Sequence, residues 1–285
     1  MRVGRSRGAA GPSDVSGKDG EGVEVATRAN GEGQGERQVI DDDALREMMR
    51  DEAPTWLEDN YYRLATFALI AVNVVVYIVE FVLSGFDFDI SSGVLLRMGA
   101  MYAPAIQSPA DLYRFVTPMF LHMDALHLLM NMVALYSVGE ALEYVLGKAG
   151  FLVLYFVAGI TGNAACYVAD LLTTGSWTLS AGASTSVFGL FVAVALLAVL
   201  CEGDHKELVA YSKGMLGVIG VNLAYTLLVP NISIAGHLGG AIGGLIAMFM
   251  VPSRNLRVPN AVRVVVAVAW VAAACGVVWY SGVLG

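Results

Sequence analysis

Four polar side chains in the apolar part of this sequence are of the kinds that acyl-transfer chemistry uses. The hydroxyl of Ser184 becomes a nucleophile when a neighbouring imidazole, here that of His237, accepts its proton. His127 and Asn131 stand at i and i+4, on one face of a helix, and both can donate hydrogen bonds to an oxyanion. The backbone N–H of Ser184, in the first turn of a helix, adds a donor. We therefore predict nucleophilic catalysis by Ser184 and His237.

No carboxylate stands where the sequence would place an obvious partner for His237. Asp170, near the end of the third apolar run, stays open as a candidate. We predict a Ser–His dyad rather than a triad. Ser186 is a rival nucleophile, but it points roughly 200° around the helix from Ser184, so only one of the two serines is expected to face the histidine.

Apolar runs of membrane-spanning length must position these residues. Of the 285 residues, 56% are hydrophobic and 15% charged, and the mean hydropathy is +0.64. A soluble domain rarely averages so apolar, whereas spans of about 20 residues suit this composition. We predict an all-α polytopic membrane protein with spans at 64–83, 122–142, 151–172, 183–200, 214–229, 233–251 and 264–283. A long connection follows the first span, and Glu80 is expected at the membrane interface.

Residues 1–55 are rich in Gly, Ser, Asp, Glu and Arg, which predicts a disordered cytoplasmic tail. A six-span catalytic core is expected over 56–252, followed by a cytoplasmic loop and a seventh span over 253–285. No apolar signal-peptide core follows Met1. The sequence has no basic stripe of the kind that binds nucleic acid. Its three cysteines, which favour neither a disulfide framework nor a metal site, are Cys166, Cys201 and Cys275.

The distribution of Lys and Arg favours a cytoplasmic N-terminus. In that orientation the inner flanks carry Arg63, Lys148, Lys206, Lys213, Arg254, Arg257 and Arg263, and the outer ones only Arg97 and Arg114. The second, fourth and sixth spans then start on the outer side. The polar residues near those starts therefore share the outer leaflet: His122, His127, Asn131, Ser184 and His237. In the sixth span Gly236, Gly240 and Gly244 recur every four residues, which predicts close approach to the fourth span.

These motifs, in this order over about residues 60–250, resemble the rhomboid family of intramembrane serine proteases. The matching positions are Tyr113-Arg114, where the family has Trp-Arg, then His122, His127 and Asn131, then Gly139 and Glu143, then Gly182-x-Ser184, and finally His237, Gly240 and Gly244. The resemblance implies a six-helix bundle, here with one extra C-terminal transmembrane helix.

The resemblance also implies a role for each of these residues. Ser184 would be the nucleophile and His237 the general base, with Asn131, His127 and the Ser184 backbone forming the oxyanion hole. The supporting residues would be Gly182, which permits the backbone conformation before the serine, His122, which supports the long first loop, Arg114 and Glu143, which are structural, and Phe188, which stacks on His237. One departure is Thr185, a β-branched residue where the family commonly has Gly, which could narrow the cleft or change the donor geometry.

The function implied is hydrolysis of single-pass membrane proteins near the outer leaflet, without a cofactor. The expected location is a bacterial plasma membrane, with the site opening to the outside and the lipid bilayer as a partner. Two alternatives stay open: a proteolytically inactive relative that binds and escorts membrane proteins, and a transporter of small solutes or protons that uses the buried histidines. The sequence names neither the physiological substrate, nor the cleavage preference, nor the oligomeric state.

Overall fold

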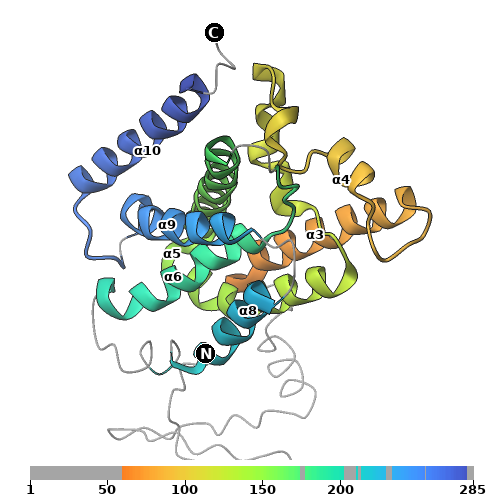
Figure 1. Ribbon diagram of the computed structural model, residues 1–285. Helices are drawn as coiled ribbons and strands as arrows, with labels where there is room; N and C mark the ends of the chain where they lie inside the picture. Colours follow the sequence, from red (N-terminus) through yellow and green to blue (C-terminus); the bar gives the residue numbers. More distant parts are fainter. Residues whose placement is uncertain are drawn as a thin grey trace, which may run out of the picture. The chain divides into compact units, whose positions relative to one another are not determined.

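The computed structural model describes residues 60–173, 177–201, 210, 213–228, 233–253 and 255–280 (Figure 1). The tail predicted over residues 1–55 lies outside the described residues. Within the described part, every regular element is a helix, and extended backbone pairs only in isolated bridges. The predicted all-α class is therefore confirmed.

In chain order, the described helices are η1 (Tyr61–Arg63), α3 (Leu64–Leu83), α4 (Ser92–Met98), η2 (Ala103–Ala105), η3 (Pro109–Phe115), η4 (Thr117–Phe120), α5 (Ala125–Leu172), α6 (Ser184–Leu200), α8 (Leu216–Leu228), α9 (Ile234–Met250) and α10 (Asn260–Tyr280). Among the described residues, α3, α5 and α10 are long and apolar enough to cross a membrane, and α6 and α9 contain shorter apolar helices.

Helix α5 joins two predicted spans and begins later than expected. Gly147 has φ +73° and ψ 163°, which are not helical, so α5 bends there into the helices expected as the second and third spans. Its first helical residue is Ala125 because Asp124 caps it, accepting a hydrogen bond of 2.8 Å from the backbone N–H of His127. His122 therefore precedes the helix instead of lying on its face.

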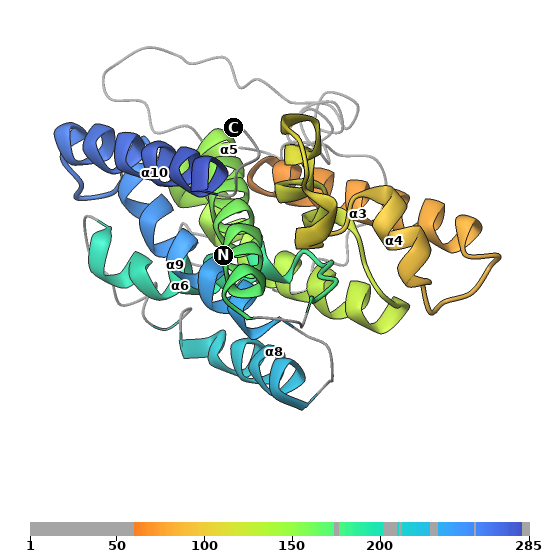
Figure 2. The ribbon, with the colours of Figure 1, turned by 45° about the horizontal axis from the view of Figure 1, so that its top comes forward.

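Helices α5, α6 and α9 pack on one another, α3 packs on α5, and α10 packs mainly on α9 (Figures 1 and 2). The core between them is apolar and includes the fully buried side chains of Leu135, Leu142, Leu154, Leu190 and Leu197. On α3 the buried residues recur every three or four positions, so a single stripe faces α5. The rest of α3 is exposed, for example Val75 at 59%.

Glycines bring α9 against α6. A Cβ on Gly240 would collide with the backbone carbonyl of Thr185, and one on Gly244 would collide with the backbone of Gly189. The two helices therefore touch backbone to backbone, which only glycine allows. This approach sets the starts of α6 and α9 side by side.

The long connection after α3 holds the segment that leads into α6. Met101 and Ser180 exchange two backbone hydrogen bonds of 2.9 Å, and the Gly182 N–H donates to the Pro118 carbonyl at 2.8 Å. The buried guanidinium of Arg114 donates to the carbonyls of Leu96 and Ala100, each at 3.0 Å. These bonds tie the connection to itself and to residues 180–182.

Two carboxylates on or beside α3 lie inside the bundle. Glu143 of α5 is fully buried and accepts hydrogen bonds from the N–H groups of Ala65 and Thr66, each at 3.0 Å, and from the Thr66 hydroxyl at 3.1 Å. It satisfies the free N–H groups at the start of α3 and lies at the positive end of that helix dipole. Glu80, expected at the interface, is also fully buried, because its carboxylate accepts from the His122 N–H.

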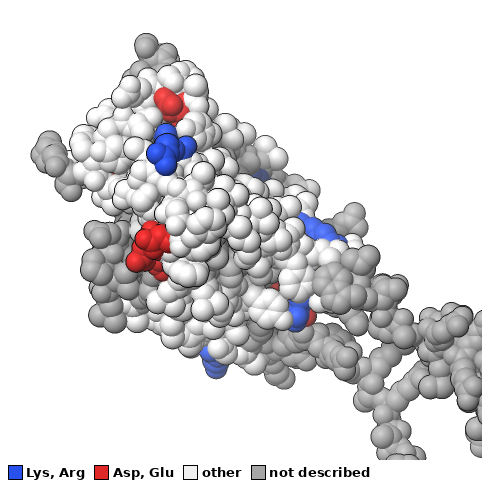
Figure 3. Space-filling view, turned by 90° about the vertical axis from the view of Figure 1, so that its right-hand side faces the viewer, with Lys and Arg blue, Asp and Glu red and all other residues white. Residues whose placement is uncertain are grey.

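The outer face of this bundle is mostly apolar. Figure 3 shows one face of the molecule, on which most described residues are uncharged and the acidic and basic side chains are few and scattered. The exposed apolar side chains include Ile78 of α3 at 54%, and Val265 and Trp279 of α10 at 67% and 74%. Such a surface suits contact with lipid rather than with water.

Candidate active site

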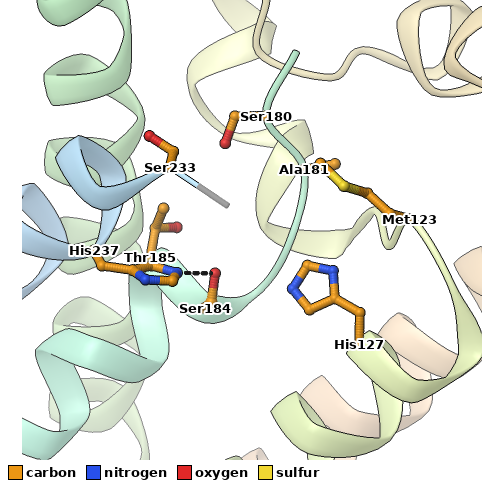
Figure 4. Close-up of a pocket in the computed structure, with 8 residues that line it drawn as sticks. All are labelled: Met123, His127, Ser180, Ala181, Ser184, Thr185, Ser233 and His237. Atoms are coloured by element: carbon orange, nitrogen blue, oxygen red, sulfur yellow. Dashed lines mark hydrogen bonds between the residues drawn. The ribbon is translucent and has the colours of Figure 1, made fainter. Parts of the chain in front are cut away.

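Ser184 and His237 meet where α6 and α9 begin. The Oγ of Ser184 lies 2.7 Å from Nε2 of His237, and Figure 4 shows the imidazole directed at the hydroxyl. Ser184 is the first residue of α6, and His237 lies in the first turn of α9. The distance is that of a hydrogen bond between a nucleophile and a base.

Two contacts fix the imidazole of His237, and a helix cap orients the turn that carries it. Phe188, one turn after Ser184, stacks on it with ring centroids 4.2 Å apart and planes 7° from parallel. On its far side, Nδ1 lies 2.9 Å from Oγ1 of Thr226 on α8. Ser233 caps α9 by accepting from the Gly236 N–H at 3.0 Å, which sets the direction of the first turn.

Asp170, which the sequence left open as a partner of the histidine, is engaged elsewhere. Its carboxylate accepts from the backbone N–H of Thr178, with oxygens at 3.2 and 3.3 Å. Ser186, the rival nucleophile, is fully buried, and its Oγ lies 3.4 Å from Sδ of Met119. The structure therefore brings Ser184 rather than Ser186 to His237.

The backbone before Ser184 needs glycine for two reasons. Gly182 has φ +143°, a conformation that residues with a Cβ rarely adopt. A Cβ there would also lie 2.6 Å from Cε1 and 2.8 Å from Nε2 of His127. The ring of His127 is thereby held next to the turn that presents Ser184.

The two side chains predicted as oxyanion donors, His127 and Asn131, lie at different distances from the cavity. His127 lines the same small cavity as Ser184 and His237 (Figure 4). Asn131 is buried one turn further along α5, and its Nδ2 donates to the His127 carbonyl at 2.9 Å. It is not among the residues that line the cavity. The free backbone N–H of Ser184 at the start of α6 supplies a donor beside the nucleophile.

The cavity at the dyad is small and partly polar. Its volume is about 10 Å³, which is close to the room that one water molecule needs. It is lined by Met123, His127, Ser180, Ala181, Ser184, Thr185, Ser233 and His237. Behind it the Cys166 thiol lies 3.1 Å from the Ser233 hydroxyl.

His122 supports the site from behind. It is fully buried, and its ring packs edge-on against that of His127, with centroids 5.3 Å apart. It is not a lining residue of the cavity. With its backbone N–H on Glu80, His122 links the end of α3 to the start of α5, so the residues around His127 are fixed from two sides.

Thr185 fits beside the nucleophile because its neighbours are small. Its side chain is 3% exposed. A Cβ on Gly162 would lie 2.7 Å from Cβ and 3.0 Å from Cγ2 of Thr185, and a Cβ on Gly236 would lie 3.3 Å from that Cγ2. The branched side chain therefore fills space that two glycines leave open, and the dyad keeps its hydrogen bond.

Thr226 is the contact that sequence reasoning missed. It lies in the predicted fifth span, where a threonine is an ordinary helical residue that bonds its own backbone. The signal that could have found it is its spacing of four residues from Asn222, a polar residue in the same span. In the described part of the chain, no group of three or more His, Cys, Asp or Glu side chains could hold a metal ion.

The fold is an all-α bundle of apolar helices, and two of these helices bring a serine and a histidine together. These features are those of a polytopic membrane protein with a paired serine and histidine. The family model for the Rhomboid domain matches residues 109–254, just over half of the chain. The chain belongs to the rhomboid family and is an integral membrane protein.

Several relatives carry protease names. The chain is 32% identical over 220 residues to Rhomboid protease GluP of Bacillus subtilis (strain 168), covering 76% of this chain and 40% of that protein. It is 33% identical over 175 residues to Rhomboid-like protease 3 of Toxoplasma gondii, covering 61% and 64%. It is 34% identical over 147 residues to Putative rhomboid protease YdcA of Bacillus subtilis (strain 168), covering 51% and 70%. The chain thus spans less than two thirds of the first two relatives.

Proposed function

We propose that this protein is an intramembrane serine endopeptidase with a Ser184–His237 dyad that cuts single-pass membrane proteins near the outer leaflet. The observation that carries the proposal is the 2.7 Å contact between Ser184 Oγ and His237 Nε2. The relatives named as proteases support the reaction class.

The reaction runs in two stages. Ser184 Oγ attacks the scissile carbonyl carbon while its proton passes to His237 Nε2, and His127 with the Ser184 N–H stabilises the oxyanion. The imidazolium then protonates the leaving amine, and the C–N bond breaks. A water attacks the ester with His237 again as the base. The Ser184 ester bond breaks, Oγ recovers its proton, and the new C-terminal carboxylate leaves.

The substrate must present an extended segment to this site. Helical carbonyls are hydrogen-bonded and shielded, so a transmembrane substrate has to unwind locally before attack. Gly or Pro near the cleaved bond lowers the cost of that unwinding. The apolar exterior of the bundle suits a substrate that arrives through lipid, and the Lys and Arg distribution favours an orientation with the start of α6 on the outer side.

The test is cleavage of a single-pass substrate by the purified protein in liposomes. We compare the parent with Ser184→Ala, His237→Ala and a matched control, Ser186→Ala, on the same helix. The parent and the control should cut, and the two dyad variants should lose at least about a thousand-fold in rate. A fluorophosphonate should label the parent on Ser184.

The opposite result is equally clear. A parent that is folded, does not cut and is not labelled contradicts the protease reading. Retention of the unlabelled parent on a single-pass protein would then support the binding and escort function. Cleavage that survives in Ser184→Ala would show a different nucleophile.

A further inference from the structure

We infer that Thr226 is a positioning residue that holds His237 in the tautomer a general base requires. The inference rests on the proposed function, because it concerns how the base of that dyad is prepared. It adds to the dyad a third group, a hydroxyl from α8, at the ring nitrogen where no carboxylate of the described residues is bonded.

The argument starts from the single proton of a threonine hydroxyl. Thr226 Oγ1 donates that proton to the carbonyl of Asn222, one turn earlier on α8, at 2.9 Å. A hydroxyl has one proton and two lone pairs. Toward Nδ1 of His237, 2.9 Å away, it can therefore only accept. The proton of the neutral imidazole must then sit on Nδ1.

The other ring nitrogen follows from this. A neutral imidazole carries one proton, so Nε2 of His237 has a free lone pair. That lone pair faces Ser184 Oγ at 2.7 Å and can accept the serine proton. The chain of hydrogen bonds runs from Ser184 to His237, to Thr226 and to the Asn222 carbonyl, with every donor pointing the same way.

The reverse arrangement would disable the dyad. If the Thr226 hydroxyl donated to Nδ1, the ring proton would sit on Nε2 and would point at Ser184, and no base would remain. The bond to the Asn222 carbonyl opposes this arrangement, because turning the hydroxyl toward the ring gives that bond up. Burial strengthens the selection, since His237 and Thr226 are each only 6% exposed and bulk water cannot replace the lost partner.

The decisive variants separate the hydroxyl from the shape of the side chain. Thr226→Val removes the hydroxyl and keeps the branch, and Thr226→Ser keeps the hydroxyl. The matched control is Thr161→Val on α5, because Thr161 makes the same bond to its own helix, to the Val157 carbonyl at 2.6 Å, and contacts Trp270 instead of the dyad.

Two measurements are made on each variant. The first is kcat and KM for the substrate in liposomes. The second is the ¹⁵N spectrum of the imidazoles, which is tractable because the chain has four histidines. The His237 signals are assigned as those that vanish in His237→Ala. This spectrum reports the tautomer whether or not the protein cuts.

We expect a protonated Nδ1 and an unprotonated Nε2 on His237 in the parent and in Thr226→Ser. In Thr226→Val the Nδ1 proton has no acceptor, so the signals should shift toward the Nε2 tautomer and kcat should fall about ten-fold to a hundred-fold, with KM nearly unchanged. Thr226→Ser should retain kcat within about three-fold, and Thr161→Val should match the parent.

Three results overturn the inference: an Nε2-protonated His237 in the parent, an unchanged tautomer in Thr226→Val, or a Thr226→Ser variant as slow as Thr226→Val. Failure of the proposed function looks different. In that case the parent does not cut and is not labelled by a fluorophosphonate, while the ¹⁵N spectra still show whether Thr226 sets the tautomer.

Discussion

The ring of His127 packs so closely against Gly182 that no side chain larger than a hydrogen atom fits at position 182. A Cβ on Gly182 would come within 2.6 Å of His127 Cε1 and within 3.3 Å of Ser184 Oγ. The residue that turns the chain into α6 is thus also the residue that lets a candidate oxyanion donor reach the nucleophile.

Gly182→Ala should therefore disable the site more than it destabilises the fold. The new methyl group displaces His127 and strains a φ of +143°. We expect turnover to fall by at least about a hundred-fold, in line with loss of an oxyanion donor. The control is Gly93→Ala on α4, where an added Cβ meets nothing within 4 Å. Equal turnover in the two variants would contradict this account.

Thr185→Gly should lower stability without improving catalysis. The threonine fills the space beside Gly162 and Gly236, so its removal leaves a void and adds a glycine to the first turn of α6. We expect a loss of about 1–3 kcal/mol in the free energy of unfolding, measured by denaturant titration in detergent. Turnover should stay within a few-fold of the parent. A large gain in turnover would show that Thr185 obstructs the cleft.

Glu143→Gln should destabilise the bundle strongly. The carboxylate accepts three hydrogen bonds from Ala65 and Thr66, and an amide would turn a donor toward one of those donors. We expect a loss of about 2–4 kcal/mol in the free energy of unfolding. The control is Glu140→Gln on the same helix, which pairs with Arg63 in a partly exposed position and should cost less than about 1 kcal/mol. Similar losses in both variants would refute the capping role.

Asp111, in the long connection outside the spans, should titrate below the ordinary range of an aspartate. Hydrogen bonds from the Ser108 hydroxyl and then from the Gln107 N–H lower the pKa of its carboxyl. A lowered pKa in the folded state stabilises η3 at pH values above the unfolded pKa, and that contribution disappears as the pH falls through the folded pKa. A carboxyl ¹³C titration should give a midpoint below that of an unperturbed aspartate.

The variant Ser108→Ala supplies the comparison for that titration. It should move the Asp111 midpoint up toward the ordinary value, because the strongest of the hydrogen bonds is gone. Ser91→Ala, at the cap of α4, removes a serine hydroxyl that Asp111 does not contact and should leave the midpoint where it was. An unchanged midpoint in Ser108→Ala would show that another group lowers the pKa.

The sequence predicted those parts of the fold that depend on length and hydropathy. The bounds of α3 agree with the predicted span, because Arg63 and Ser84 flank a continuous apolar run. The start of α5 was placed three residues early, because hydropathy cannot see that Asp124 caps the helix. The bond of Glu80 with the His122 backbone could not be predicted, because the two residues are 42 positions apart in the sequence.

The residues of the site could be predicted where the type of side chain itself indicates the chemistry. Ser184, His237 and Phe188 could be chosen from type, spacing and resemblance, and the structure brings them together. Thr226 could not be chosen, because its contact with His237 depends on how α8 meets α9 in three dimensions. Asn131 stays a prediction, because its Nδ2 donates one hydrogen bond to the His127 carbonyl and an amide nitrogen carries a second hydrogen.

The cavity of about 10 Å³ at the dyad has a kinetic consequence. We expect the site to widen when a peptide segment enters it, and in that case the apparent dissociation constant equals the intrinsic one divided by the fraction of molecules that are open. Variants that loosen the packing near α6 and α9 should then lower KM and leave kcat unchanged.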